Sequence, residues 1–125
     1  MAELAASTGA TQFSVNLTAA SVSRGARLTL DSSGTCAASA IGVRGDYVAA
    51  TAGAASATIA AVPLQLGAIV PMIASEAIAV GGVVYSAASG KVSTTSGGGA
   101  IYIGKANTAA SGDGVLFEVL LGNPA

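Results

Sequence analysis

The chain has 125 residues and a mass of 11.8 kDa, which fits a single domain. Hydrophobic residues make up 52% of it and charged residues only 9%, and this composition excludes a disordered, highly solvated chain. Five basic against six acidic residues give a net charge of −1, which argues against nucleic acid or an anionic membrane as the main partner. Alanine supplies much of the apolar content and aromatic residues only 4%, so we expect a thin core that needs support from a partner or from oligomerisation.

Alternation of apolar and polar residues predicts short β-strands along the chain. The first example, FSVNLTA at 13–19, sets Phe13, Val15 and Leu17 against polar neighbours. Such alternation, or a short β-branched run, predicts strands at 13–19, 26–31, 46–52, 57–65, 67–74, 82–87, 90–95, 100–106 and 114–121. A spacing of roughly ten residues, with Gly and Ser turns between, is typical of a small all-β barrel or sandwich.

Residues 1–20 are predicted to be an N-terminal arm or edge strand, and residues 21–125 a single β-rich domain. The segment MAELAASTGATQ has no sustained periodicity and is not expected to fold alone. The strand at 13–19 then becomes a template for pairing with another chain. The alternative is that 13–19 closes the protein's own barrel. The first ten residues lack a basic start and an apolar run, so we expect no signal peptide.

Positive charge is concentrated at Arg24, Arg27 and Arg44. Asp31 and Asp46 lie beside them in the sequence, which favours a solvated face of mixed charge over a phosphate site.

The stretch 47–75 carries no charge, which raises the question of a membrane span. Pro63, Pro71 and Gln65 lie inside it, and no Lys or Arg occurs between Arg44 and Lys91 to anchor its end. We therefore predict no transmembrane helix and no membrane partner.

The residues on which most enzymes depend are scarce. The chain has no histidine, and Cys36 is its one cysteine, so we expect neither a disulfide nor a transition-metal site, and we interpret Cys36 as a small buried residue. The six carboxylates are scattered, with no close pair to act as general acid and base. Ser89 and Lys91 fit a hairpin turn better than a catalytic dyad. We predict no catalytic residue, no metal site, no cofactor and no enzymatic activity.

Residues 99–106 read GAIYIGKA and come within one letter of the phosphate-binding loop, G-x-x-x-x-G-K-[ST]. Ala106 stands where that loop has the hydroxyl that holds magnesium. The interior of the segment is rich in Ile and Tyr, which favour an extended backbone, and no sustained helix follows Lys105. We interpret this segment as a β-strand.

An internal β-repeat is the simplest account of a second pattern. Residues 25–39 resemble residues 81–95, with Gly25 and Gly81 and the two Ser-Gly pairs at 33–34 and 89–90 each 56 positions apart. An Ile-Gly pair follows in both halves, at 41–42 and at 103–104. Each half is then expected to hold a hairpin, an Ile-Gly strand and a closing strand; the alternative is chance similarity in a chain rich in Ala, Gly and Ser.

The C-terminal half carries a family pattern. It reads as an I..G..VY element, a GKV hairpin and an ending of the form IG.A...A..GD.V.V.L. The matching residues are Ile78, Gly81, Val84, Tyr85, Gly90, Lys91, Val92, Ile103, Gly104, Ala106, Ala109, Gly112, Val115, Val119 and Leu121. In their order and spacing, residues 67–121 resemble the capsid cement, or decoration, proteins of tailed phages, a family long of unknown function.

This resemblance implies a function. A protein of this family binds the outer surface of the assembled phage head and stabilises the shell by bridging neighbouring subunits. It would have the major capsid protein as its partner, form a homotrimer, and reside on the virion after synthesis in the host cytoplasm. The alternative is a structural β-domain of a phage tail or baseplate. Candidate residues for contact with another subunit or with the capsid are Phe13, Val15, Leu17, Arg24 and Arg27.

Overall fold

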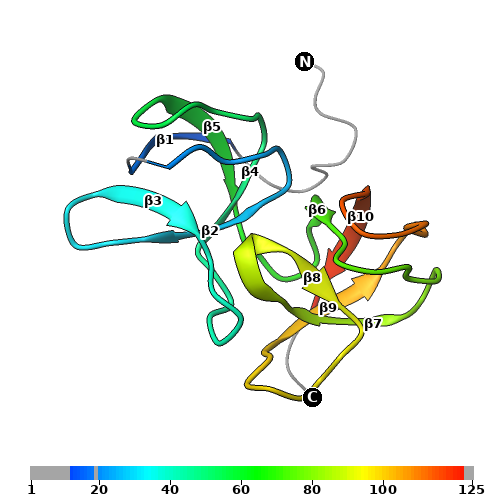
Figure 1. Cartoon of the computed structure of the whole chain (residues 1–125). Helices are drawn as coiled ribbons and strands as arrows, with labels where there is room; N and C mark the ends of the chain where they lie inside the picture. Colours follow the sequence, from blue (N-terminus) through cyan, green and yellow to red (C-terminus); the bar gives the residue numbers. More distant parts are fainter. Residues whose placement is uncertain (1–11, 19, 123–125) are drawn as a thin grey trace.

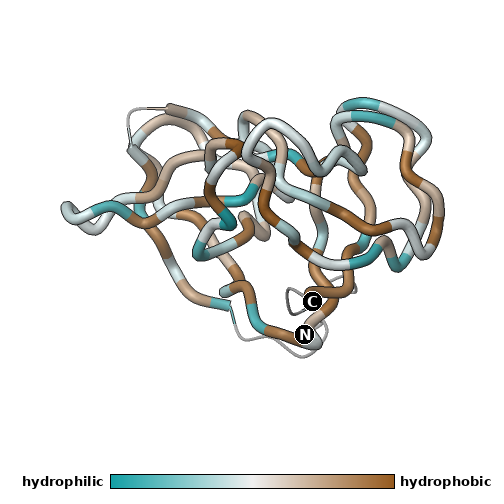
Figure 2. Tube along the Cα trace, turned by 90° about the horizontal axis from the view of Figure 1, so that it is seen from below, coloured by the Kyte–Doolittle hydropathy of each residue, from teal (hydrophilic) through white to brown (hydrophobic). Residues whose placement is uncertain are grey.

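The computed structural model describes residues 12–18 and 20–122. Within this range the chain is all-β, with one short 3-10 turn at Ala88–Gly90, which confirms the fold class expected from the alternation. Ten strands form two units of five strands that follow one another along the chain and lie side by side (Figure 1). Strongly polar positions are few and scattered along the trace (Figure 2).

The first unit is a closed barrel. Its strands are β1 (Phe13–Leu17), β2 (Arg27–Leu30), β3 (Thr35–Ala38), β4 (Tyr47–Ala49) and β5 (Thr58–Pro63), in the order β1-β3-β2-β4-β5. β1 pairs antiparallel with β5 and parallel with β3, and these two pairings close the barrel. Residues 13–17 therefore lie in the chain's own barrel, the alternative to an arm, while residues 1–11 lie outside the described part.

The second unit follows the same plan without full closure. Its strands are β6 (Ile69–Ile73), β7 (Val83–Ser86), β8 (Val92–Ser93), β9 (Tyr102–Ala106) and β10 (Leu116–Leu121), in the order β6-β10-β9-β7-β8. Among the described residues, its two edge strands, β6 and β8, meet in a single parallel bridge, between Ala74 and Val92. The corresponding contact in the first unit is the ladder between β1 and β3.

Equivalent pairings establish the internal repeat in detail. β2 pairs with β3 and β4, and β7 pairs in the same way with β8 and β9, while β5 and β10 each close against the strand that opens their unit. An isolated bridge joins Val22 to Gly53 in the first unit, and its counterpart joins Ile78 to Ala110 in the second. The predicted repeat is thus a duplicated five-stranded unit.

One part of the repeat alignment was wrong. Ile103 and Gly104 lie in β9, but Ile41 and Gly42 lie in a turn between β3 and β4. The true counterpart of β9 is β4, because Val48 pairs with Arg27 as Lys105 pairs with Val83. Ile41 and Gly42 thus lie in the loop before β4 and not in a strand.

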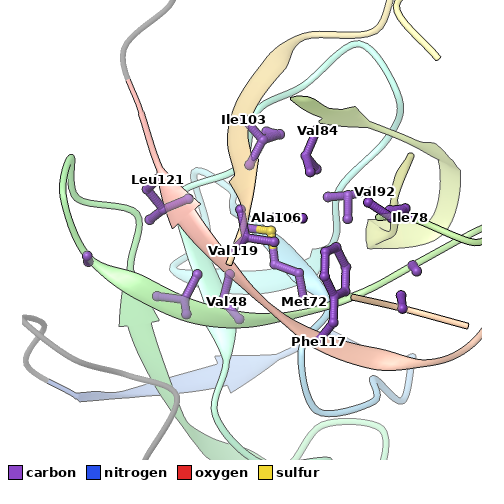
Figure 3. Close-up of a cluster of buried hydrophobic side chains, with 14 of the residues drawn as sticks. Val48, Met72, Ile78, Val84, Val92, Ile103, Ala106, Phe117, Val119 and Leu121 are labelled. Atoms are coloured by element: carbon purple, nitrogen blue, oxygen red, sulfur yellow. The ribbon is translucent and has the colours of Figure 1, made fainter. Parts of the chain in front are cut away.

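Two buried clusters fill the molecule. One lies inside the first barrel and includes Val15, Leu17, Leu28 and Cys36. The other fills the second unit and continues into the outer face of the first, since Val48, Ala50 and Val62 pack with residues of β6, β7, β9 and β10 (Figure 3). β4 also contacts the edge strand β6. The first barrel therefore covers the side on which the second unit is incompletely closed.

Candidate functional site

The most specific polar arrangement in the molecule lies at the junction of the two units. Arg27 projects from β2 and is fully buried. Its Nε donates to the carbonyl of Lys91 at 3.0 Å, Nη2 to that of Ala87 at 2.6 Å, and Nη1 to those of Val43 and Arg44. The guanidinium thus joins the loop before β4 to the hairpin turn between β7 and β8.

No carboxylate forms an ion pair with Arg27 within the described part of the chain. Burial lowers the pKa of Arg27 to about 10, so the group keeps its charge at neutral pH. The guanidinium donates to four backbone carbonyls at once, because its planar shape carries several N–H donors in fixed directions. The arrangement is a structural clamp.

A second arginine reinforces the clamp from the same loop. Arg44 donates to the carbonyl of Tyr102 at 2.8 Å and to that of Gly122 at 3.3 Å, both in the second unit. Close by, the N–H of Gly90 donates to the carbonyl of Ser39 at 2.8 Å. The two units are therefore joined by side-chain and backbone hydrogen bonds as well as by a shared apolar cluster.

The predicted contact residues separate into two groups. Phe13, with 51% of its surface exposed, and Arg24 lie on the surface. Val15 and Leu17 face the interior of the first barrel, and Arg27 is in the clamp. Contact with another molecule stays a prediction for Phe13 and Arg24, which alone of the five are exposed.

The segment that resembles a phosphate loop is a strand, as predicted. β9 covers Tyr102–Ala106, and Lys105 projects from it toward solvent. This strand is followed by a turn and not by a helix, and it pairs with β7 on one side and β10 on the other. Nothing in that geometry can wrap a phosphate group.

Groups that resemble catalytic residues have structural surroundings. Lys91 forms an ion pair with Asp113 at 2.9 Å. The Cys36 side chain is buried in the first barrel, and burial, with a smaller effect of Asp46 and Asp31, raises the pKa of its thiol. In residues 12–18 and 20–122, no group of three metal-ligating side chains lies together. None of the described helical turns is long or apolar enough to cross a bilayer.

Sequence reasoning missed the exposed apolar side chains of the second unit. Leu66, Val80, Val83 and Leu120 have between 37% and 66% of their surface exposed. A shallow hollow of about 290 Å³ lies on the outer side of β6 and β10, lined by Pro71, Thr108, Leu116, Phe117 and Glu118. Continuously apolar strands are typical of burial on both faces, so the exposure of these side chains could not be predicted from their own residue types. Glu118, at an outward position of β10, was the local sign of an open face.

The comparisons with known proteins concern the fold. No family model matches the chain, and neither does any curated protein. Among solved structures, the chain is similar to the N base of the head fiber gp8.5 of bacteriophage phi29, with 18% sequence identity and a TM-score of 0.71. The match covers 90% of this chain and 93% of that chain, so it spans both five-stranded units. What the two proteins share is the fold.

Proposed function

We propose that this chain is a structural protein of a phage head, and specifically a cement protein that binds the outer surface of the shell. The observation that carries the proposal is the similarity of both units, over 90% of the chain, to the base of a phage head fiber. The order of motifs in residues 67–121, which resembles the cement proteins, supports the same assignment independently of the fold.

The construction of the chain suits a bridging role. A protein that holds two capsid subunits together has to transmit a pull from one attachment surface to another. Here the two units share an apolar cluster and are clamped through Arg27 and Arg44, so a force on one unit is transmitted to the other. Each copy binds weakly at each of its two contacts. Once one contact has formed, the second forms at a high effective concentration, so many copies together resist separation of the capsid subunits.

The major capsid protein is the proposed partner, and the outer surface of the virion the proposed location. Phe13 and Arg24 are the proposed contact residues on the first barrel, since both are exposed. Aromatic residues and arginine are enriched at protein interfaces. No cofactor or catalytic step enters this function.

The test uses the phage that encodes the chain. Heads and tails are separated and analysed by mass spectrometry, and heads lacking the chain are then incubated with purified protein and sedimented. We expect the chain in the head fraction, saturable binding to heads, and greater resistance of the decorated heads to heating. Recovery in the tail fraction instead would support the tail or baseplate alternative, and absence from virions would overturn both.

The contact residues have their own test in the same assay. Phe13→Ser with Arg24→Glu should lower binding to heads at least tenfold. Leu30→Ser is the matched control, because Leu30 is 44% exposed on the same barrel and is not a predicted contact. Equal binding by the wild type, the double variant and Leu30→Ser would show that Phe13 and Arg24 are not the contact residues of the first barrel.

A further inference from the structure

The internal repeat gives each outward position of β4 and β5 a counterpart on β9 and β10. Val48 pairs with Val62 in the first unit, as Lys105 pairs with Leu120 in the second. Val48 and Val62 are fully buried, because this outer face of the first barrel packs on the second unit. The same face of the duplicated fold is therefore already an interface between two barrels.

The equivalent face of the second unit has no cover in the described chain. We call it the β9–β10 face and define it by Lys105, Asn107, Glu118 and Leu120. Lys105 and Asn107 are exposed, Glu118 is half-buried, and Leu120 has 40% of its surface exposed. Where the first unit has Val48, Ala50 and Ala60, this face has a cation, an amide and a carboxylate.

The two charges of this face form no ion pair with each other in the described part of the chain. Lys105 lies opposite Leu120, two positions from Glu118 along β10, which makes the two charged residues diagonal neighbours. The Glu118 carboxylate accepts from Asn107 Nδ2 at 3.1 Å and is in no ion pair, and neither is Lys105, among residues 12–18 and 20–122. The face thus offers one cation, one anion and an exposed leucine.

We propose that the β9–β10 face binds the same face of a second copy of this chain across a two-fold axis. A surface with one charge of each sign is complementary to itself after a half-turn, which is what a two-fold interface requires. An axis midway between Lys105 and Glu118 brings each Lys105 to the Glu118 of the other copy, so two ion pairs form. The hollow beside Glu118, lined by Pro71 and Leu116, leaves room for side chains that project from the other copy.

This contact closes at two copies. It does not depend on the proposed cement function, and the trimer implied by the family resemblance would need a different, heterologous surface. Mass measurements separate the cases, because a dimer has twice and a trimer three times the 11.8 kDa of the chain.

Charge reversal tests the proposal on the full chain. Sedimentation velocity over a concentration series should show the wild type approaching twice the mass of one chain. Lys105→Glu and Glu118→Lys should each raise the dimer dissociation constant at least tenfold, because each change replaces two attractions by two like-charge contacts. An equimolar mixture of the two variants should regain the wild-type affinity, since the mixed pair restores both attractions.

Two further proteins complete the experiment. Ser96→Glu adds a negative charge in the exposed loop between β8 and β9, outside the face, and it should leave the dissociation constant unchanged. If Glu118→Lys lowers the melting temperature, Leu120→Asp replaces it as the variant that disrupts the face. Leu120 is exposed and makes no side-chain hydrogen bond, so this change should raise the dissociation constant without unfolding the chain. A wild type that stays monomeric at millimolar concentration, a trimer that ignores both reversals, or a mixture that fails to recover affinity would overturn the proposal.

Discussion

Replacing Arg27 by methionine isolates the contribution of the clamp between the two units. Methionine has a similar length and keeps the apolar packing of the side chain, but it donates no hydrogen bond. Four carbonyls then lose a charged donor, and at least 1.5 kcal/mol for each such bond gives a loss of about 6 kcal/mol. The variant also no longer buries a cation, and the lowering of the Arg27 pKa to about 10 by burial puts that relief at about 3 kcal/mol.

The hydrogen bonds outweigh the burial of the charge, so Arg27→Met should lower the free energy of unfolding by about 3 kcal/mol. Urea denaturation followed by circular dichroism measures this change. With a slope of about 1.5 kcal/mol per molar urea, the midpoint should fall by about 2 M. Arg24→Met is the matched control, because Arg24 is exposed and should change the stability by less than about 0.5 kcal/mol.

A result within 0.5 kcal/mol of the wild type would refute this reasoning, since the four carbonyls would then be satisfied equally well by water. A stabilised Arg27→Met protein would refute it more sharply. It would show that the cost of burying the guanidinium exceeds the contribution of all its hydrogen bonds.

Three other predictions follow from the described contacts. A Cβ at Gly104 would stand 2.1 Å from a carbonyl oxygen of β10, so Gly104→Ala should lower the free energy of unfolding by about 3 kcal/mol or more in the same denaturation assay. Gly97→Ala is the control, because no atom lies near the added Cβ, and it should change this free energy by less than about 0.5 kcal/mol. Deleting residues 1–18 removes β1 with both pairings that close the first barrel, so thermal unfolding should lose its cooperative transition; a sharp transition at the wild-type temperature would show that β1 is dispensable. Hydrogen bonds from Thr94 lower the pKa of Glu76, so their contribution to stability is present above the ordinary pKa of 4.5 and is lost as the pH falls through the lowered value. Glu76→Gln should therefore reduce the fall in melting temperature at acidic pH. The same fall in the variant and the wild type would contradict this prediction.

Local patterns in the sequence were sufficient for nine of the ten described strands, while β3 (Thr35–Ala38) was indicated only by the hairpin of the repeat. The repeat itself was also predicted, apart from the pairing of the two Ile-Gly dipeptides. In FSVNL the alternation places Val15 and Leu17 in the barrel and leaves Ser14 and Asn16 outside, because strand residues point to opposite faces in turn. The charge pattern predicted a solvated face for Arg27, and Arg27 does project from the outer side of the first barrel, as its partner Val48 does. The charge pattern failed to predict burial because the second unit covers that outer face, and no local pattern shows what a distant segment will cover.

A signal for the covered face was nevertheless present. TIAAVP at 58–63 is apolar at consecutive positions, which is typical of a strand buried on both sides. The corresponding strand, LFEVLL at 116–121, carries Glu118 on its outer face. Comparing the two halves position by position would have identified which unit lies under the other.

The unequal closure of the two units sets an order for folding during synthesis. The first barrel closes through its own β1, so all of its strands are available once residue 63 has left the ribosome. The second unit has a seam between β6 and β8, and it completes its apolar interior only against Val48 and Val62 of a barrel that already exists. We therefore expect the first barrel to fold first and the second unit to fold against it. If the order of the two halves in the gene were exchanged, the second unit would be synthesised first, and its apolar interior would stay exposed to solvent until the barrel that covers it had folded.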